Sequence, residues 1–248
     1  MMRVLLLGGT AEARALAGLL HPRVDIISSL AGRVPRPALP AGPVRVGGFG
    51  GVEGLRRWLR DERIGAVVDA THPFAATITA HAATVCAELR LPYLALVRPP
   101  WDPGSAIVVG SDIEAAETIS RKGFSRVFLT TGRSSVGAFA ASDAWFLIRV
   151  VTAPDAGSLP RRHAIVLARG PYHYDAECAL LREHRIDVLV TKNSGGEMTR
   201  AKLDAAAALD IPVVMVARPA LPAGVRAVGT VGEAVQWVTR LTGGTPGR

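Results

Sequence analysis

Glycines, hydroxyl side chains and basic residues follow one apolar run after another along this chain of 248 residues. The first such place is Gly8-Gly9-Thr10, which separates the apolar residues 4–7 from a helix-forming stretch that begins with Ala11, Glu12 and Ala13. A glycine turn lets a ligand approach the backbone, and a helix N-terminus attracts phosphate. We therefore predict a nucleotide site from Gly8 to Ala13. The complete G-x-G-x-x-G pattern is absent, and similar turns occur in α/β proteins that bind no nucleotide, so this stretch alone leaves both interpretations open.

The second predicted strand, residues 24–28, is followed by Ser29, Gly32 and Arg33. In nucleotide-binding folds an acidic residue after this strand holds the adenosine ribose of NAD, whereas a basic residue accommodates the 2′-phosphate of NADP. Arg33 therefore favours NADPH as the cofactor. The alternative is a loop arginine in solvent.

A further predicted strand, residues 66–69, leads into Thr71, His72, Pro73 and Phe74. Pro73 suits the first turn of the next helix, so the strand end would carry Thr71 and His72 toward the nicotinamide. His72 is the candidate catalytic residue, as a proton donor. The alternative is a histidine that only hydrogen-bonds the cofactor or the backbone, and Tyr172 and water are the other candidate donors.

Strand ends in the second half of the chain carry residues suited to an anionic substrate. Lys192-Asn193-Ser194-Gly195 precedes a predicted helix and resembles an anion-binding nest; a capped loop between strand and helix is the plainer interpretation. The residues assigned to the substrate are Phe74, Arg98, Thr131, Gly132, Arg133, Arg169, Gly170, Lys192, Asn193, Ser194 and Gly195.

Short apolar runs alternate with helical stretches along the whole chain. This order predicts an α/β fold with two Rossmann-like domains whose sheets are mainly parallel. The proline-rich segment 98–104 interrupts the alternation. It places the boundary between an N-terminal domain, residues 1–99, and a C-terminal domain, residues 100–244.

The net charge is +8, and lysine occurs only at positions 122, 192 and 202. Arginine holds carboxylates and phosphates with a two-pronged fork. The sequence has no run of five basic residues and only 5% aromatic residues, so we expect a small polyanion rather than nucleic acid as the partner. A solvated arginine-rich surface would account for many of the same residues.

No apolar run approaches the roughly 20 residues of a membrane span, and we expect a cytoplasmic protein with no membrane partner. Cys86 and Cys178 form no C-x-x-C pair, so we expect no metal site.

Several blocks in this order closely resemble the precorrin-6A reductase family of cobalamin biosynthesis. They include Gly8-Gly9-Thr10, Ser29-Leu30-Ala31-Gly32-Arg33, Gly47-Gly48-Phe49-Gly50-Gly51, Asp69-Ala70-Thr71-His72-Pro73-Phe74-Ala75, Arg98-Pro99-Pro100-Trp101, Thr130-Thr131-Gly132-Arg133, Arg169-Gly170-Pro171 and Thr191-Lys192-Asn193-Ser194-Gly195-Gly196.

The resemblance implies NADPH-dependent reduction of one double bond of precorrin-6A, giving precorrin-6B. It also implies cofactor and substrate in a cleft between two Rossmann-like domains, and it allows a strand exchanged between them. A tetrapyrrole with many carboxylates suits the arginine-rich composition. The cobalt-containing intermediate of the anaerobic route is the alternative substrate, and a non-catalytic nucleotide-binding module is the alternative to an enzyme. Both a monomer and a homodimer are compatible with the sequence.

Overall fold

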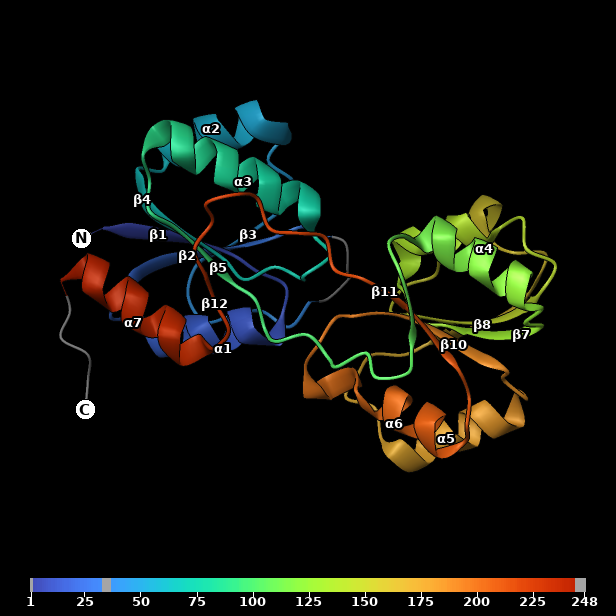
Figure 1. Ribbon diagram of the computed structural model, residues 1–248. Coiled ribbons are helices and arrows are strands. Elements are labelled where there is room, and N and C mark those ends of the chain that lie inside the picture. Colours follow the sequence, from blue (N-terminus) through green and yellow to red (C-terminus); the bar gives the residue numbers. More distant parts are fainter. Residues whose placement is uncertain (1, 33–36, 244–248) are drawn as a thin grey trace. The chain divides into compact units, whose positions relative to one another are not determined.

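The chain forms two compact units, which the computed structural model describes over residues 2–32 and 37–243 (Figure 1). The first unit extends to Pro99 and resumes at Pro219, and the second is Pro100–Arg218. Each unit has a six-stranded sheet, and every strand pair in the described residues is parallel. The predicted α/β class with two Rossmann-like sheets is therefore confirmed.

The sheet of the first unit has the order β12-β5-β4-β1-β2-β3. Helices cover both of its faces (Figure 1). Its strands are β1 (Arg3–Leu7), β2 (Asp25–Leu30), β3 (Val44–Val46), β4 (Ile64–Asp69), β5 (Tyr93–Leu96) and β12 (Ala227–Val228), and its helices are α1 (Ala11–Leu20), α2 (Gly51–Asp61), α3 (Ala76–Leu89) and α7 (Val231–Thr242).

The sheet of the second unit has the order β6-β11-β10-β7-β8-β9. Its strands are β6 (Ile107–Val109), β7 (Arg126–Leu129), β8 (Trp145–Val150), β9 (Arg162–Leu167), β10 (Val188–Lys192) and β11 (Val213–Val216). Its helices are α4 (Asp112–Lys122), α5 (Tyr174–Glu183) and α6 (Ala201–Ala208), with short 3-10 turns η1 (Arg133–Phe139), η2 (Ala156–Ser158) and η3 (Glu197–Thr199).

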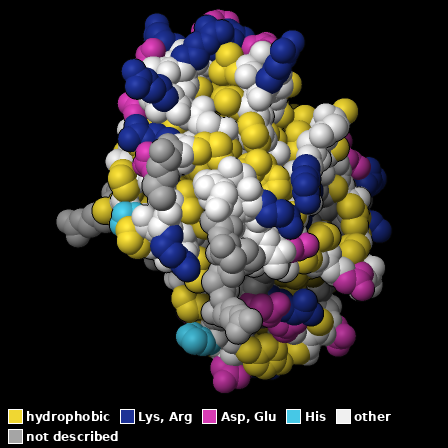
Figure 2. All heavy atoms as spheres, turned by 90° about the vertical axis from the view of Figure 1, so that its left-hand side faces the viewer, with side chains coloured by type: hydrophobic (Ala, Val, Ile, Leu, Met, Phe, Trp, Pro, Cys, Tyr) yellow, Lys and Arg dark blue, Asp and Glu magenta, His cyan; other side chains and the backbone are white. Residues whose placement is uncertain are grey.

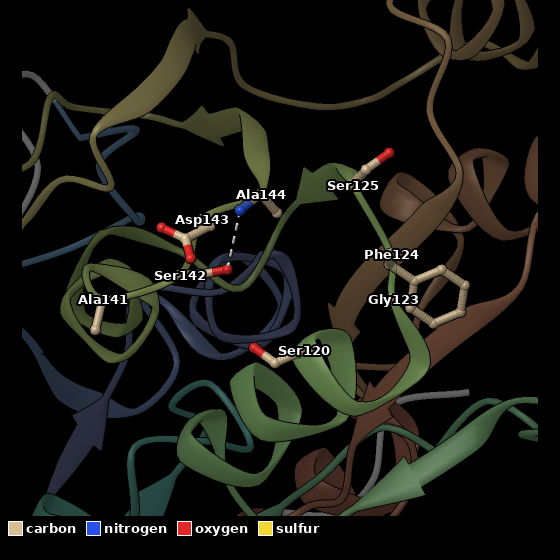
Figure 3. A pocket seen from close by; sticks show the side chains of 8 residues that line it. All are labelled: Ser120, Gly123, Phe124, Ser125, Ala141, Ser142, Asp143 and Ala144. Atoms are coloured by element: carbon tan, nitrogen blue, oxygen red, sulfur yellow. Dashed lines mark hydrogen bonds between the residues drawn. The ribbon is translucent and has the colours of Figure 1, made fainter.

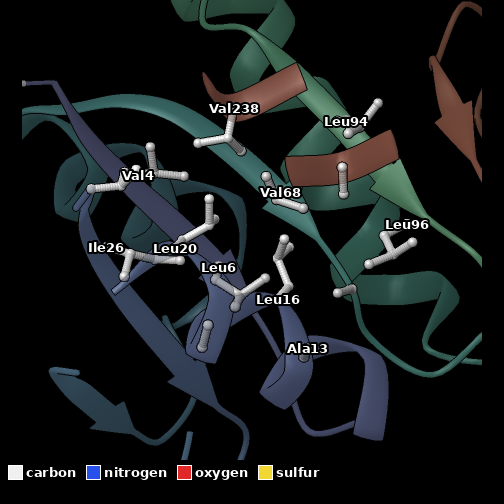
Figure 4. Packing of buried hydrophobic residues seen from close by; sticks show 14 of the residues in the cluster. Val4, Leu6, Ala13, Leu16, Leu20, Ile26, Val68, Leu94, Leu96 and Val238 are labelled. Carbon is white, nitrogen blue, oxygen red and sulfur yellow. The ribbon is translucent and has the colours of Figure 1, made fainter. Parts of the chain in front are cut away.

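Alternate side chains of each central strand pack against opposite helix layers. Val4 and Leu6 of β1 lie in one buried cluster with α1 and α7 (Figure 4), whereas Leu5 and Leu7 lie in another with α2 and α3. A strand buried on both faces must be apolar throughout, and this explains the unbroken run in β1. The core therefore holds the carboxyl end of β1 rigidly in the middle of the sheet.

The predicted C-terminal domain, residues 100–244, is wrong in its second boundary. Residues after Pro219 belong to the first unit, because β12 pairs with β5 at the sheet edge: Ala95 and Val97 donate backbone hydrogen bonds to Arg226 and Val228. Trp237 and Val238 of α7 are then buried with α1. A two-residue strand leaves almost no periodic signal.

Pro73 also differs from its predicted place in the first turn of a helix. Helix α3 begins at Ala76, and residues 72–75 form a turn closed by a 2.7 Å hydrogen bond from Ala75 N to His72 O. The residue before a proline avoids helical backbone angles, so His72 stays in the loop.

Candidate functional site

Four residues form a row across four neighbouring strands of the first unit, from the central strands to the edge strand β3. Leu7 pairs in register with Asp69 of β4 on one side and with Ser29 of β2 on the other, and Ser29 pairs with Arg45 of β3. Ligands of open parallel sheets bind beyond this edge. The row therefore brings together the loops predicted from the sequence and adds Arg45, which we did not single out.

The glycine turn joins this row to helix α1. Gly8 donates its N–H to Ser29 O at 2.9 Å, and Gly9 has φ +112°, a conformation that favours glycine. A Cβ built on Gly9 meets no atom within 4 Å, so the space above the turn is open to a ligand.

Thr10 caps helix α1. Its hydroxyl accepts from Ala13 N at 3.1 Å and donates to Ala70 O at 2.8 Å. A ligand at this turn would therefore not use the Thr10 hydroxyl or Ala13 N–H as donors, because both already have protein partners. The backbone N–H groups of Ala11 and Glu12 lie in the first turn of α1 and have no acceptor within the helix, so these two are the remaining candidate donors to a ligand.

Glu12 and Arg98 form an ion pair inside the first unit, with 3.0 Å between Arg98 Nη1 and Glu12 Oε2. The sequence assigned Glu12 to the cofactor and Arg98 to the substrate. The structure brings them together and links the start of α1 to the segment after β5.

Asp69 is buried and organises the loop after β4. One carboxylate oxygen accepts from Thr71 N at 3.0 Å and Thr71 Oγ1 at 2.6 Å, and the other accepts from Thr79 at 2.7 Å and Tyr93 at 2.9 Å. Burial, reinforced by the negative charge of Asp69, raises the pKa of Tyr93 and also raises the pKa of Cys86 to about 12. Tyr93 therefore stays a hydrogen-bond donor, and Cys86 stays a thiol.

His72 is exposed on the same loop as Thr71 and Pro73. Its Nδ1 accepts from Phe74 N at 3.3 Å, and the His72 and Phe74 rings lie 5.9 Å apart. Nδ1 used as an acceptor leaves Nε2 as the nitrogen that can carry a transferable proton.

The predicted nucleotide residues Ser29 and Gly32 lie at the carboxyl end of β2: Ser29 is the last but one residue of the strand, where a loop residue was predicted, and Gly32 follows the strand. Gly32 has φ +72° and sits against Val46. Arg33 lies outside the described residues. Arg45 extends over the edge instead: its Nη1 donates to Ser29 Oγ at 2.8 Å and to Gly47 O at 2.9 Å.

Lys192 in the second unit forms an ion pair with Asp112 of α4 at 3.5 Å and donates to Ser135 Oγ. The predicted substrate residues Thr131 and Gly132 lie in the loop that leads to this cluster, and the Thr131 hydroxyl is buried with no partner in the described residues. Arg133 is exposed at the start of η1. No sequence motif indicates that a carboxylate of α4 would reach Lys192.

Asn193 holds the chain where it enters and leaves the second unit. Its side-chain amide accepts from Trp101 N at 2.9 Å and donates to Trp101 O at 3.0 Å, and its backbone O accepts from Arg218 Nε at 2.7 Å. The loop then passes Ser194 and turns at Gly195, φ +67°, and Gly196, φ +80°. The predicted substrate residue Asn193 thus has a structural task within its own unit.

A buried charged cluster that the sequence did not reveal lies at the carboxyl end of the second sheet. Arg149 of β8 pairs with Glu177 of α5, and the Tyr172 ring stacks on the Arg149 guanidinium at 3.7 Å. Tyr172, which follows the predicted substrate residues Arg169 and Gly170, donates its hydroxyl to Ala168 O at 3.1 Å, and burial raises its pKa. The hydroxyl proton of Tyr172 is therefore already donated to a backbone acceptor inside this unit.

Lys202 of α6 completes the cluster. It is buried, its ammonium lies 5.3 Å from the Trp101 ring, and burial together with the charge of Arg149 lowers its pKa to about 7. In the unfolded chain a lysine titrates near 10.4. Between pH about 7 and pH about 10.4 the unfolded state therefore binds more protons than the folded state. The buried lysine lowers the free energy of unfolding by its full amount below pH about 7, and this destabilisation disappears progressively as the pH rises toward about 10.4.

Replacing Lys202 by methionine is therefore expected to stabilise the protein. Replacing buried charge with an apolar side chain contributes about 1–4 kcal/mol, and this gain should be largest at pH 6 and shrink toward pH 10. Urea unfolding across this pH range measures it, with Lys122→Met at an exposed helix end as the control. A gain that does not change with pH would contradict the assignment.

The pocket drawn in Figure 3 lies away from these residues. Its lining comes from the end of α4, from the turn before β7 and from the turn before β8, which is the opposite end of the strands from the predicted loops: Ser120, Gly123, Phe124, Ser125, Ala141, Ser142, Asp143 and Ala144. None of the predicted site residues lines it.

The described residues contain no group of three or more His, Cys, Asp or Glu side chains placed to hold a metal ion. On the face shown in Figure 2, Lys and Arg side chains lie among hydrophobic and acidic ones. None of the described helices is both long and apolar enough to cross a membrane.

The comparisons with known proteins agree with the resemblance. The profile of the family Precorrin-6x reductase CbiJ/CobK matches residues 3–239. The Precorrin-6A reductase of Mycobacterium tuberculosis is 75% identical over 241 residues, which cover 97% of this chain and 99% of the relative. The Precorrin-6A reductase of Rhodococcus erythropolis is 52% identical over 248 residues, which cover 98% of this chain and 99% of the relative.

A solved structure, CobK precorrin-6A reductase, is 37% identical and has a TM-score of 0.88, covering 99% of both chains. Because profile, sequences and structure all match over almost the full length, the chain belongs to the Precorrin-6x reductase CbiJ/CobK family.

Proposed function

We propose that this chain reduces one double bond of precorrin-6A to give precorrin-6B, with NADPH as the reductant. The proposal that the first unit binds NADPH rests on one observation. Asp69, Leu7, Ser29 and Arg45 form a row beside the open glycine turn that leads into α1. Family membership and the high identity to reductases of this name support the reaction.

The residues of the first unit fit a dinucleotide. Gly9 leaves open space at the turn, and the first-turn N–H groups of Ala11 and Glu12 can donate to its pyrophosphate. No acidic residue follows β2 in the described chain, since Ser29 leads into Leu30, Ala31 and Gly32. A cation at this edge suits a phosphorylated ribose better than a free one. The cofactor supplies a hydride when it is bound.

The loop held by Asp69 places Thr71, His72 and Pro73 beside the turn, since Thr10 bonds Ala70 O and β4 adjoins β1. His72 is our candidate to give the proton that accompanies the hydride, from Nε2. The carboxyl-end loops of the second unit, with Arg133, Arg169 and Lys192, are the proposed contacts for the substrate's carboxylates. A cytoplasmic enzyme would meet both NADPH and this polyanion.

The test is an anaerobic assay with purified protein and precorrin-6A, in which loss of NADPH absorbance is followed and the product mass is measured. We expect a product two hydrogens heavier, with NADPH preferred over NADH. A folded protein that consumes neither nucleotide would overturn the proposal, and a parallel assay with the cobalt-loaded macrocycle separates the alternative substrate.

The same assay tests His72. General acid catalysis typically contributes about 10²–10⁴-fold, so His72→Gln should lower kcat by at least about 10²-fold with little change in the KM for NADPH. His81→Gln, on helix α3, is the matched control. An unchanged kcat would exclude His72 as the donor.

A further inference from the structure

Arg45 lies where a specificity residue would lie, although no sequence motif predicts a ligand contact on strand β3. It pairs in register with Ser29, and Ser29 pairs with Leu7, the residue directly before the glycine turn. Adjacent strands lie about 4.8 Å apart. Arg45 is therefore two strands, or about 10 Å, from the turn proposed to hold the pyrophosphate.

The guanidinium is fixed in one orientation. Nη1 donates to Ser29 Oγ at 2.8 Å and Gly47 O at 2.9 Å, and Nη2 donates to Gly48 O at 3.1 Å. Its plane lies over the Phe49 ring at 3.9 Å, and the Trp58 ring is 5.3 Å away. A pre-oriented guanidinium loses little side-chain entropy when it binds an anion.

The positive charge of Arg45 has no neutralising partner in the described part of the chain. All three acceptors are uncharged oxygens, and no carboxylate lies within 4.0 Å of the guanidinium in the residues that the structure describes. Partial burial disfavours the charge and lowers the pKa of Arg45. A cation that is half-buried, oriented and without an anion is suited to a phosphate group.

We infer that Arg45, assisted by the Ser29 hydroxyl, binds the 2′-phosphate of NADPH and sets the preference for NADPH over NADH. This rests on the proposed function, and it deepens that proposal by naming the residue and the phosphate. Ser29 accepts from Arg45 and so can donate its own hydroxyl proton to the same phosphate. A Cβ built on Gly47 or Gly48 meets no atom within 4 Å, so the space beside these two backbone acceptors of Arg45 is open to a ligand.

The experiment compares Arg45→Gln and Arg45→Lys with the wild type, using 2′,5′-ADP and 5′-AMP as calorimetric probes. Arg45→Gln should weaken 2′,5′-ADP binding by at least about 10-fold, as expected for loss of a charge-assisted hydrogen bond, and leave 5′-AMP binding within about 2-fold. Arg45→Lys keeps the charge but loses the fork, so its affinity should be intermediate. In the anaerobic reductase assay, the KM for NADPH should rise and that for NADH should not.

Arg57→Gln, an exposed site on α2 with the same charge change, is the control, and Arg33→Gln tests the residue expected from the sequence. Equal weakening of both probes, or a loss that follows Arg33→Gln and spares Arg45→Gln, would overturn the inference. Thermal unfolding checks that the variants fold. If Arg45→Gln does not fold, the binding of the two probes is compared between Arg45→Lys and the wild type. If the wild type binds neither probe, the proposed cofactor itself has failed.

Discussion

Asp69→Ala is expected to lower the free energy of unfolding by about 3 kcal/mol or more. The carboxylate is buried and accepts from Thr71, Thr79 and Tyr93. Alanine would leave the hydroxyls of Thr79 and Tyr93 without this acceptor, and each buried unsatisfied group costs about 1–3 kcal/mol. Urea denaturation of the whole chain measures the loss.

The same substitution should also impair nucleotide binding, because Asp69 fixes Thr71 and the turn that carries His72. Asp61→Ala, at the exposed end of α2, is the matched control and should change stability by no more than about 0.5 kcal/mol. Equal stability of the two variants would show that the hydrogen-bond network does not hold this loop.

Gly54→Ala should be about equally damaging, for a steric reason. A Cβ on Gly54 would lie 1.7 Å from the backbone O of Phe49, so either the helix or the loop must move. We expect a loss of about 3 kcal/mol or more, together with weaker NADPH binding, since Phe49 supports the Arg45 guanidinium.

Gly18→Ala provides the contrast, since it is the same substitution at an exposed position of helix α1. A Cβ there meets no atom within 4 Å, and removing a helix glycine normally stabilises by about 0.5–1 kcal/mol. Thermal unfolding of both variants should therefore give shifts of opposite sign. A tolerated Gly54→Ala would mean that the contact between α2 and the Phe49 loop is not rigid.

Local patterns were sufficient to predict much of this protein. An apolar run followed by a glycine turn and a helix start has few folded solutions, and its repetition dictates parallel sheets. For this reason the strand ends before Gly8 and Thr71, and the first boundary at Pro99, could be located before any coordinates, whereas the predicted strand 24–28 stops two residues before the end of β2 at Leu30.

Tertiary structure decided which strand ends become neighbours and which charges are compensated. The register between β2 and β3 places Ser29 beside Arg45. The chain returns to the first unit after residue 218, which places β12 beside β5. Folding of the second unit brings Asp112 to Lys192. These pairings join residues far apart in sequence, and no periodicity records them.

The glycine turn shows both contributions. Sequence chemistry predicts a phosphate site at Gly8-Gly9-Thr10, but the donors that remain are known only after packing commits the Thr10 hydroxyl to Ala70 O and Ala13 N–H to Thr10. A sequence specifies which polar groups are available, whereas the packed fold determines which of them the protein itself uses, because most buried donors find an acceptor within the fold.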